Sequence, residues 1–293
     1  MGRRKKYIDY DYDQVFESID NLEESRILDA LNKRDITSAY ATKTVKSGNQ
    51  LEVEIYPEFT KKKAITKDGR FSKRKDIQNN LNNKNAKKTL MRLINTNFTD
   101  KDYFLTLTFS KEPMDEEEAM KHVKNYLKCV NRLRKKKGLE NAKYIFVVES
   151  RKEDGSKVRT HVHMLIEHGL TMDELEGKWK HGRRNQCRRL DPTEEDGLNG
   201  LANYLVKAPK ASKYKKKWVS SRNLKKPVIR KNHQDFSNKK VKKMVEDITS
   251  IPAVMTKKFK AEFKSVEIRY NSYNNKWYLY VKMYFKEWGM QHE

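Results

Sequence analysis

Two apolar segments joined by a short turn limit the folds open to this chain more than any other feature. Residues 144–149 and 160–166 have the apolar, β-branched composition of strands, and a turn signal lies between them at 153–156. Such a turn can join antiparallel neighbours, whereas parallel strands need a crossover of about a dozen residues or more. The sequence therefore predicts an antiparallel sheet here and argues against a doubly wound parallel sheet.

Strand and helix patterns alternate around this pair. Residues 103–109 have a strand composition. An apolar stripe at 120–133 then indicates a helix, for which Asp115 is the N-cap and Gly138 the stop. After the pair we expect a short helix, a strand and a last helix, over 172–180, 184–190 and about 194–207. This order predicts an α+β fold, a central antiparallel sheet with helices packed on it.

Two β-hairpins and a basic helix flank this centre. Residues 38–59 alternate around Gly48, and 266–285 alternate around the turn at 274–275. In the second hairpin we expect Leu279 and its alternate neighbours to face the core, with the tyrosines at 278, 280 and 284 on a half-exposed face. A basic helix is expected over 77–98. We divide the chain into a peripheral basic and acidic segment, a hairpin with a basic helix, a central core, and a basic segment with a hairpin, over 1–37, 38–101, 102–210 and 211–293.

The charge balance indicates a polyanionic partner. The 293 residues include 65 Lys and Arg against 40 Asp and Glu, a net charge of +25. Cations that neutralise backbone phosphates release condensed counterions, so this surplus favours binding to nucleic acid. A Lys-rich surface without such a partner is the plainer alternative.

Much of the surplus lies in one stretch. Residues 208–243 hold fourteen Lys and Arg against one acidic residue, Asp235. Aromatic residues among the cations suit a track for DNA backbone with places for bases to stack, although a Lys-rich loop is an alternative. The candidate DNA-binding residues are Lys210, Lys213, Tyr214, Lys215, Lys216, Lys217, Trp218, Arg222, Lys225 and Lys226.

Several classes of protein are excluded by composition. No apolar run approaches the roughly 18 residues of a membrane-spanning helix. The basic start of the chain is not followed by an apolar stretch, so we expect no secretory signal. Two cysteines, Cys129 and Cys187, are too few for a disulfide scaffold or a zinc finger. We expect a cytoplasmic protein with no membrane partner.

A His-x-His pattern in the third central strand is the first candidate for chemistry. His161 and His163 leave the same face of a strand, because side chains alternate with a period of two. Two adjacent imidazoles suit a divalent metal, and on spacing alone a solvated or hydrogen-bonded His pair is the alternative. Glu149, in the partner strand, is the better third ligand because Glu167 lies roughly 14 Å along the strand. A surface acid is the alternative for Glu149.

A tyrosine and a lysine near the end of the last central helix are the second candidate. Tyr204 and Lys207 are three residues apart, which places phenol and ammonium on one helix face. The Tyr-x-x-Lys pattern occurs four times, starting at Tyr40, Tyr204, Tyr214 and Tyr273. Position and context favour Tyr204. It lies on an amphipathic helix that follows the histidine strand and leads directly into the basic segment. Tyr214 is the nearest rival.

The ordered motifs resemble a known group of enzymes. A Leu-Thr-Leu-Thr-Phe strand, a His-hydrophobe-His strand and a helical Tyr-x-x-Lys, spanning 103–207, resemble the HUH endonucleases. The resemblance is strongest to rolling-circle replication initiators of the filamentous-phage gene II and small-plasmid type. Residues 220–227 and 47–59 also look similar to this group. The resemblance implies a ferredoxin-like nuclease core with β-rich N- and C-terminal extensions.

The resemblance also implies roles for individual residues. His161 and His163 would bind Mg²⁺ or Mn²⁺, with Glu149 the third ligand. Tyr204 would attack a phosphodiester of single-stranded DNA, retain the 5′ phosphate and free a 3′-OH, while Lys207 assists the charged transition state. Some relatives carry two tyrosines one turn apart, but positions 200, 201, 207 and 208 are Gly, Leu, Lys and Ala. A single-tyrosine enzyme is therefore expected.

The expected function is metal-dependent nicking and joining of single-stranded or hairpin origin DNA in rolling-circle replication. The chain contains no Walker A motif, so a separate helicase is expected beside a DNA polymerase. A conjugative relaxase or single-strand transposase of the same chemistry is one alternative. A non-catalytic basic nucleic-acid-binding protein is the alternative from another class.

Overall fold

The computed structural model describes residues 38–59, 75–113, 115–151, 156–205, 218–271 and 276–286. The predicted peripheral segment at 1–37, most of the turn at 153–156 and the turn at 274–275 lie outside these residues. The chain forms two compact units. The central unit is Ala86–Lys226, and the terminal unit combines Met1–Asn85 with Pro227–Glu293. The predicted α+β class is confirmed, because each unit carries an antiparallel sheet and helices.

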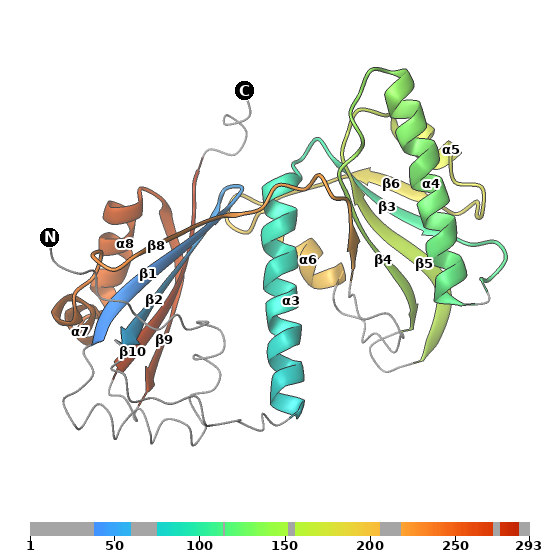
Figure 1. Cartoon of the computed structure of the whole chain (residues 1–293). Coiled ribbons are helices and arrows are strands. Elements are labelled where there is room, and N and C mark those ends of the chain that lie inside the picture. The colour runs from blue at the N-terminus through green and yellow to red at the C-terminus, as the bar shows by residue number, and fades with distance from the viewer. Residues whose placement is uncertain are drawn as a thin grey trace, which may run out of the picture. The chain divides into compact units, whose positions relative to one another are not determined.

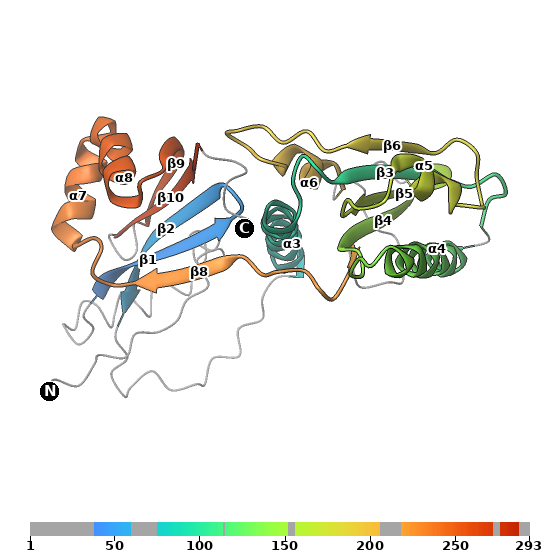
Figure 2. The ribbon, with the colours of Figure 1, turned by 90° about the horizontal axis from the view of Figure 1, so that it is seen from above.

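The central unit is built on a five-stranded sheet in the order β6-β3-β5-β4-β7. Every neighbouring pair is antiparallel, and β6, β3, β5 and β4 follow one another across the sheet in Figure 2. The strands are β3 (Tyr103–Thr108), β4 (Tyr144–Arg151), β5 (Lys157–Ile166), β6 (Gln186–Arg189) and β7 (Val219–Ser220). The antiparallel pairing of β4 with β5 confirms the prediction from the intervening turn signal.

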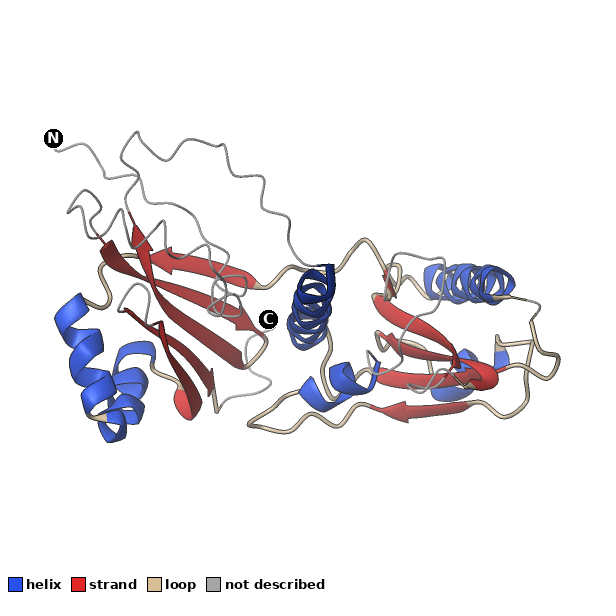
Figure 3. Ribbon diagram, turned by 90° about the horizontal axis from the view of Figure 1, so that it is seen from below, coloured by secondary structure: helices blue, strands red, loops and turns tan. Residues whose placement is uncertain are grey.

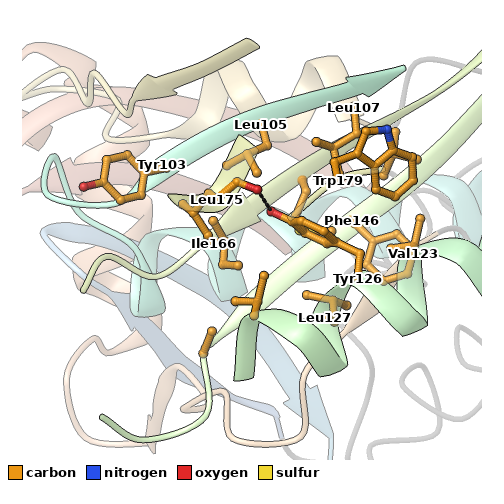
Figure 4. Close-up of a cluster of buried hydrophobic side chains, with 14 of the residues drawn as sticks. Tyr103, Leu105, Leu107, Val123, Tyr126, Leu127, Phe146, Ile166, Leu175 and Trp179 are labelled. Carbon is orange, nitrogen blue, oxygen red and sulfur yellow. Dashed lines mark hydrogen bonds between the residues drawn. The ribbon is translucent and has the colours of Figure 1, made fainter. Parts of the chain in front are cut away.

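Helices cover both faces of this sheet (Figure 1). One face packs against α4 (Glu116–Lys136) and α5 (Met172–Gly177), and the other against α3 (Lys75–Asn97) and α6 (Asn199–Leu205). The predicted N-cap is confirmed, because the Asp115 side chain accepts a hydrogen bond from the Glu118 amide at 2.8 Å. In the core beneath α4, the Tyr126 hydroxyl donates to the Leu175 carbonyl at 3.1 Å (Figure 4).

The last central helix is shorter than predicted. Its expected start near Glu194 is wrong, because residues 193–197 form a tight turn instead. The amides and carbonyls of Thr193 and Gly197 bond each other, and Gly197 has a φ of 54°. A left-handed backbone is available to glycine without a Cβ penalty, so the turn closes here and α6 begins after it. The predicted end, at residues 206–207, lies outside the described residues.

The terminal unit also has a five-stranded antiparallel sheet, in the order β8-β1-β2-β10-β9. The strands are β1 (Ser38–Ser47), β2 (Gln50–Phe59), β8 (Val228–Asn232), β9 (Glu262–Asn271) and β10 (Lys276–Tyr284). Both predicted hairpins are confirmed, and Gly48 adopts a φ of 60° at the first turn. Pairing of β2 with β10 joins the hairpins into one sheet, which the sequence did not predict.

Two helices that the sequence did not predict cover one face of the terminal sheet (Figure 3). They are α7 (Asn238–Glu246) and α8 (Ile251–Phe259), linked by the short 3₁₀ turn η1 (Ile248–Ser250). Both helices are rich in lysine, which makes their apolar residues hard to recognise in the sequence. The apolar residues Val241, Met244, Ile251 and Met255 are all buried. The half-exposed face expected for the second hairpin is wrong at two positions, because Tyr278 and Tyr280 are buried with Ala41 and Tyr56.

Within the described residues, no helix combines the length and the apolar composition needed to cross a bilayer.

Candidate active site

The pairing of β4 with β5 brings three candidate residues together. Glu149 lies opposite His161 in the ladder, and His163 leaves the same face two residues further along β5. Glu149 Oε2 is 3.2 Å from His161 Nε2 and 3.3 Å from His163 Nε2. The three residues form a compact group of nitrogen and oxygen donors, all within 4.8 Å of one another.

This donor set fits a divalent cation. Ligand atoms at about 2.0–2.2 Å from one ion lie roughly 3 Å apart, close to the observed separations. His161 Nδ1 lies 2.8 Å from the Arg159 carbonyl, which only accepts, so Nδ1 donates to this carbonyl and Nε2 is the ring nitrogen that faces Glu149. Burial, reinforced by the charge of His161, lowers the pKa of His163 from 6.5 to about 4. A neutral imidazole at pH 7 is the form that binds metal.

Tyr204 borders this group. Its hydroxyl lies 3.1 Å from His163 Nε2, and the two rings meet edge to face at 5.0 Å. The side chain is 48% exposed, so a substrate can reach the phenol from solvent. Partial burial and the negative charge of Glu149 raise the pKa of Tyr204, while Arg188 opposes them. The protein alone therefore keeps the phenol protonated near neutral pH, and additional positive charge is needed to favour the phenolate.

Contacts with α3 set the position of α6. Leu198, Ala202 and Leu205 lie at helical spacing and are buried, which turns Tyr204 toward the site. At the start of the helix, Asn95 Oδ1 accepts a hydrogen bond from the Leu198 amide at 2.8 Å. Asn95 Nδ2 also donates to the Asn199 side chain at 2.7 Å. Asn95 therefore fixes the start of α6, and Tyr204 lies near the other end of this short helix.

Phe104 and Arg188 also lie beside the candidate nucleophile, and the sequence reasoning missed both. The Phe104 ring stacks on His163 with centroids 5.6 Å apart and meets Tyr204 edge-on at 6.3 Å. The Arg188 guanidinium lies 5.2 Å from the same ring. The alternation in β3 places Phe104 on one face, but only the pairing of β6 with β3 brings Arg188 to that face.

The candidate DNA-binding residues divide into two groups. Lys207 and the candidates from Lys210 to Lys217, including Tyr214, lie outside the described residues. Trp218 is half-buried against the cluster beneath α6. The side chains of Arg222, Lys225 and Lys226 are exposed.

Hydrogen bonds hold the segment that carries these three cations. Asn97 accepts from the Lys225 amide at 2.7 Å and donates to its carbonyl at 2.8 Å. Ser221 Oγ accepts from the Tyr144 amide at 3.1 Å. The remainder of the basic stretch forms β8 and the start of α7 in the terminal unit. The basic stretch at 208–243, which we interpreted from the sequence as one track for DNA, is therefore divided between the two units.

One comparison with known proteins gives a match. Residues 102–209 match the family described as replication-associated protein ORF2/G2P. This segment runs from β3 past α6, covers about a third of the chain and includes Glu149, His161, His163 and Tyr204. No curated protein and no solved structure matches the chain significantly. The predicted resemblance to replication initiators is confirmed at the level of this family.

Proposed function

We propose that this chain, with a replication-associated segment at its centre, nicks and rejoins single-stranded DNA at an origin and so initiates rolling-circle replication. The observation that carries the proposal is the 3.1 Å separation between the Tyr204 hydroxyl and His163 Nε2. An exposed nucleophile beside a compact His, His and Glu group suits metal-assisted phosphoryl transfer to a tyrosine.

Glu149, His161 and His163 would hold Mg²⁺ or Mn²⁺. When bound, the cation would polarise the scissile phosphate and offset the negative charge that raises the pKa of Tyr204. The chain itself supplies position: β5 presents both imidazoles, β4 presents the carboxylate, and α6 brings the phenol to their edge. Positioning and charge neutralisation are the main requirements of phosphoryl transfer, which needs little other chemistry from the protein.

The proposed step exchanges one phosphoester for another. Tyr204 Oη forms a bond to phosphorus as the bond from phosphorus to the 3′ oxygen breaks. The phenol proton passes to solvent, to which the side chain is open, and the departing 3′ oxygen takes up a proton. The 5′ phosphate remains on Tyr204, and the free 3′-OH primes synthesis. Because the phosphotyrosine keeps the phosphoester energy, attack by a 3′-OH can rejoin the strand without ATP.

The proposed enzyme has one nucleophile. Asn203 and Leu205 flank Tyr204, and no tyrosine occupies the positions one turn away in the sequence. Each covalent adduct must therefore be resolved by a 3′-OH rather than by a second tyrosine in the same helix. The sequence lacks a Walker A motif, so the proposal includes a separate helicase and a DNA polymerase in the cytoplasm as partners.

A denaturing gel tests the function. The protein is incubated with Mn²⁺ and a randomised pool of single-stranded oligonucleotides, labelled in separate reactions at the 5′ or the 3′ end. We expect a protein-linked product from the 3′-labelled pool only, because Tyr204 retains the strand through its 5′ phosphate. EDTA should abolish the product, and Tyr204→Phe should abolish it while leaving DNA affinity within about two-fold of wild type.

Tyr270→Phe is the matched control, because Tyr270 is a comparably exposed tyrosine, at 44%, in the terminal unit. This variant should form the adduct as wild type does. An adduct that survives in Tyr204→Phe would assign the nucleophile to another tyrosine, with Tyr214 the first to examine. Salt-dependent DNA binding with no adduct from either pool would identify a non-catalytic binding protein instead.

A further inference from the structure

A cation that belongs to none of the sequence motifs lies on the same sheet face as the candidate active site. Arg188 in β6 pairs with Phe104 in β3, and Thr106, two residues along β3, pairs with His163 in β5. Cross-strand partners share a face, and so do residues two apart on one strand. Arg188, Phe104 and His163 therefore share the face to which α6 brings Tyr204.

One aromatic ring fixes how these groups lie. Phe104 is only 5% exposed, and its ring contacts the rings of His163 and Tyr204 and the guanidinium of Arg188. A guanidinium held over an aromatic face gains cation–π attraction and keeps its N–H groups directed outward, in its own plane. Phe104 thus positions the Arg188 guanidinium, the candidate nucleophile Tyr204 and the candidate metal ligand His163 around one ring.

Arg188 is available to a substrate, whereas the neighbouring arginines have other partners. The side chain of Arg188 is exposed, and it makes no ion pair with any residue that the structure describes. Arg159 donates to the carbonyls of Phe109 and Ser110 at 3.0 and 2.8 Å. Arg189 lies on the opposite face, over the Tyr103 ring, and donates to the Lys101 carbonyl at 2.6 Å.

We propose that Arg188 is a further catalytic residue, whose guanidinium binds the non-bridging oxygens of the phosphate that Tyr204 attacks. The inference rests on the proposed nicking function. The planar fork of N–H donors matches two phosphate oxygens, and it remains charged at every relevant pH. Glu149, His161 and His163 would hold the cation on one side of the phosphate, and Arg188 supplies positive charge on the side toward β6.

The chemistry of the step explains why such a cation accelerates it. As the bond from Tyr204 Oη to phosphorus forms and the bond to the 3′ oxygen breaks, negative charge is distributed over the equatorial phosphate oxygens. A preorganised guanidinium stabilises this charge more than it stabilises the bound ground state. Arg188 gains and loses no proton in the step. Its removal should therefore slow the chemistry more than it weakens DNA binding.

The test compares adjacent arginines on opposite faces of β6. Arg188→Gln and Arg189→Gln each remove one positive charge, and Arg188→Lys keeps the charge without the planar fork. The single-turnover rate of adduct formation is measured with Mn²⁺ and saturating amounts of the randomised single-stranded pool. Fluorescence anisotropy gives the Kd for the same pool, and thermal unfolding verifies that each variant is folded.

We expect Arg188→Gln to lower the saturated rate by about 100- to 1,000-fold while the Kd rises by less than about five-fold. Arg188→Lys should recover part of this loss, and Arg189→Gln should retain the wild-type rate. Equal effects of Arg188→Gln and Arg189→Gln, or a loss in Kd alone, would overturn the catalytic role and leave nicking intact. A wild-type protein that forms no adduct would overturn the proposed function, and this inference with it.

Discussion

Glu167 joins three elements of the central unit through one carboxylate. Oε1 accepts a hydrogen bond from Lys143 Nζ at 2.7 Å, and Oε2 lies 3.1 Å from Nη2 of the buried Arg134. Arg134 belongs to α4, Lys143 precedes β4, and Glu167 follows β5. Partial burial raises the pKa of Glu167, but the hydrogen bonds from Lys143 and the charges of Lys143 and Arg134 outweigh it, so the net pKa is lowered.

The lowered pKa makes the contribution of Glu167 to stability depend on pH. The folded protein binds this proton less readily than the unfolded chain does, so the stabilisation is complete above the unfolded pKa near 4.5. It is lost as the pH falls through the lower folded pKa. We expect Glu167→Gln to reduce the free energy of unfolding by about 1–3 kcal/mol at neutral pH, as measured by urea denaturation. The difference in the free energy of unfolding between the variant and wild type should become smaller as the pH falls toward 3.

Glu174→Gln is the control for this prediction. Glu174 also pairs with a lysine, Lys137, at 2.6 Å, but this pair is at the surface and solvent screens it. The variant should be much less destabilised than Glu167→Gln. A destabilisation of Glu167→Gln that stays constant from neutral pH to pH 3 would contradict the electrostatic origin.

At this scale, the sequence predicts a residue well when its place depends on local geometry. His161 and His163 share a face because of the two-residue period of a strand, and the turn before β5 made Glu149 a plausible neighbour. Arg188 and Asn95 could not be found in the same way. Arg188 comes to the site through the pairing of β6 with β3, and Asn95 through a contact about a hundred residues along the chain.

The element that matters most to the candidate site is α6. It has seven residues, too few to be stable in isolation, so tertiary contacts must determine its place. Its buried Ala202 and Leu205 fix which face points inward, and Asn95 fixes its start. An error of about 1 Å in the placement of a nucleophile can cost on the order of 100-fold in rate. The position of Tyr204 should therefore depend on a residue that no substrate touches.

We expect Asn95→Ala to slow adduct formation at saturating DNA by about ten-fold or more, because the Leu198 amide and the Asn199 side chain lose their partner. Binding of Mn²⁺, measured by calorimetry, should stay at the wild-type value because its candidate ligands lie on β4 and β5. Asn97→Ala is the matched control. It releases the segment at Lys225 instead, and should keep the saturated rate. A wild-type rate in Asn95→Ala would show that α6 does not need this anchor.

Elements with local signals were predictable, and those that depend on distant partners were not. Capping residues mark α4, and a glycine turn marks the pairing of β1 with β2. The pairing of β2 with β10 joins segments more than 200 residues apart, and no local pattern encodes it. Lysines on the outer face of α7 hid its apolar stripe within a stretch that was interpreted only by its charge.

At the scale of the whole molecule, the net charge of +25 favours DNA binding but does not say which cations contact phosphate. Both units are basic: Arg222, Lys225 and Lys226 are exposed in the central unit, and Lys239, Lys243 and Lys257 are exposed in the terminal unit. The first three lie on a segment fixed by Asn97 and Ser221. Because these hydrogen bonds already order the backbone, binding of phosphate there costs little backbone entropy, and the segment belongs to the unit that carries the candidate active site. We therefore expect these three to be direct contacts.

The salt dependence of binding distinguishes contact from net charge. Each phosphate contact to single-stranded DNA contributes about 0.7 to the slope of log K against log salt. Replacing Arg222, Lys225 and Lys226 together with Gln should reduce the magnitude of this slope by about 2. Anisotropy titrations of the randomised pool over a range of NaCl concentrations measure it.

A variant with the same charge change in the terminal unit makes the comparison specific. Replacing Lys239, Lys243 and Lys257 with Gln removes three exposed cations from α7 and α8, so a slope set only by net charge would change as much as in the first triple variant. If the Arg222, Lys225 and Lys226 segment contacts the strand, only the first variant should lose about 2. Equal losses would mean that cations of the terminal unit also bind the strand, or that net charge alone governs the affinity. An unchanged slope in the first variant would move the DNA track away from this segment.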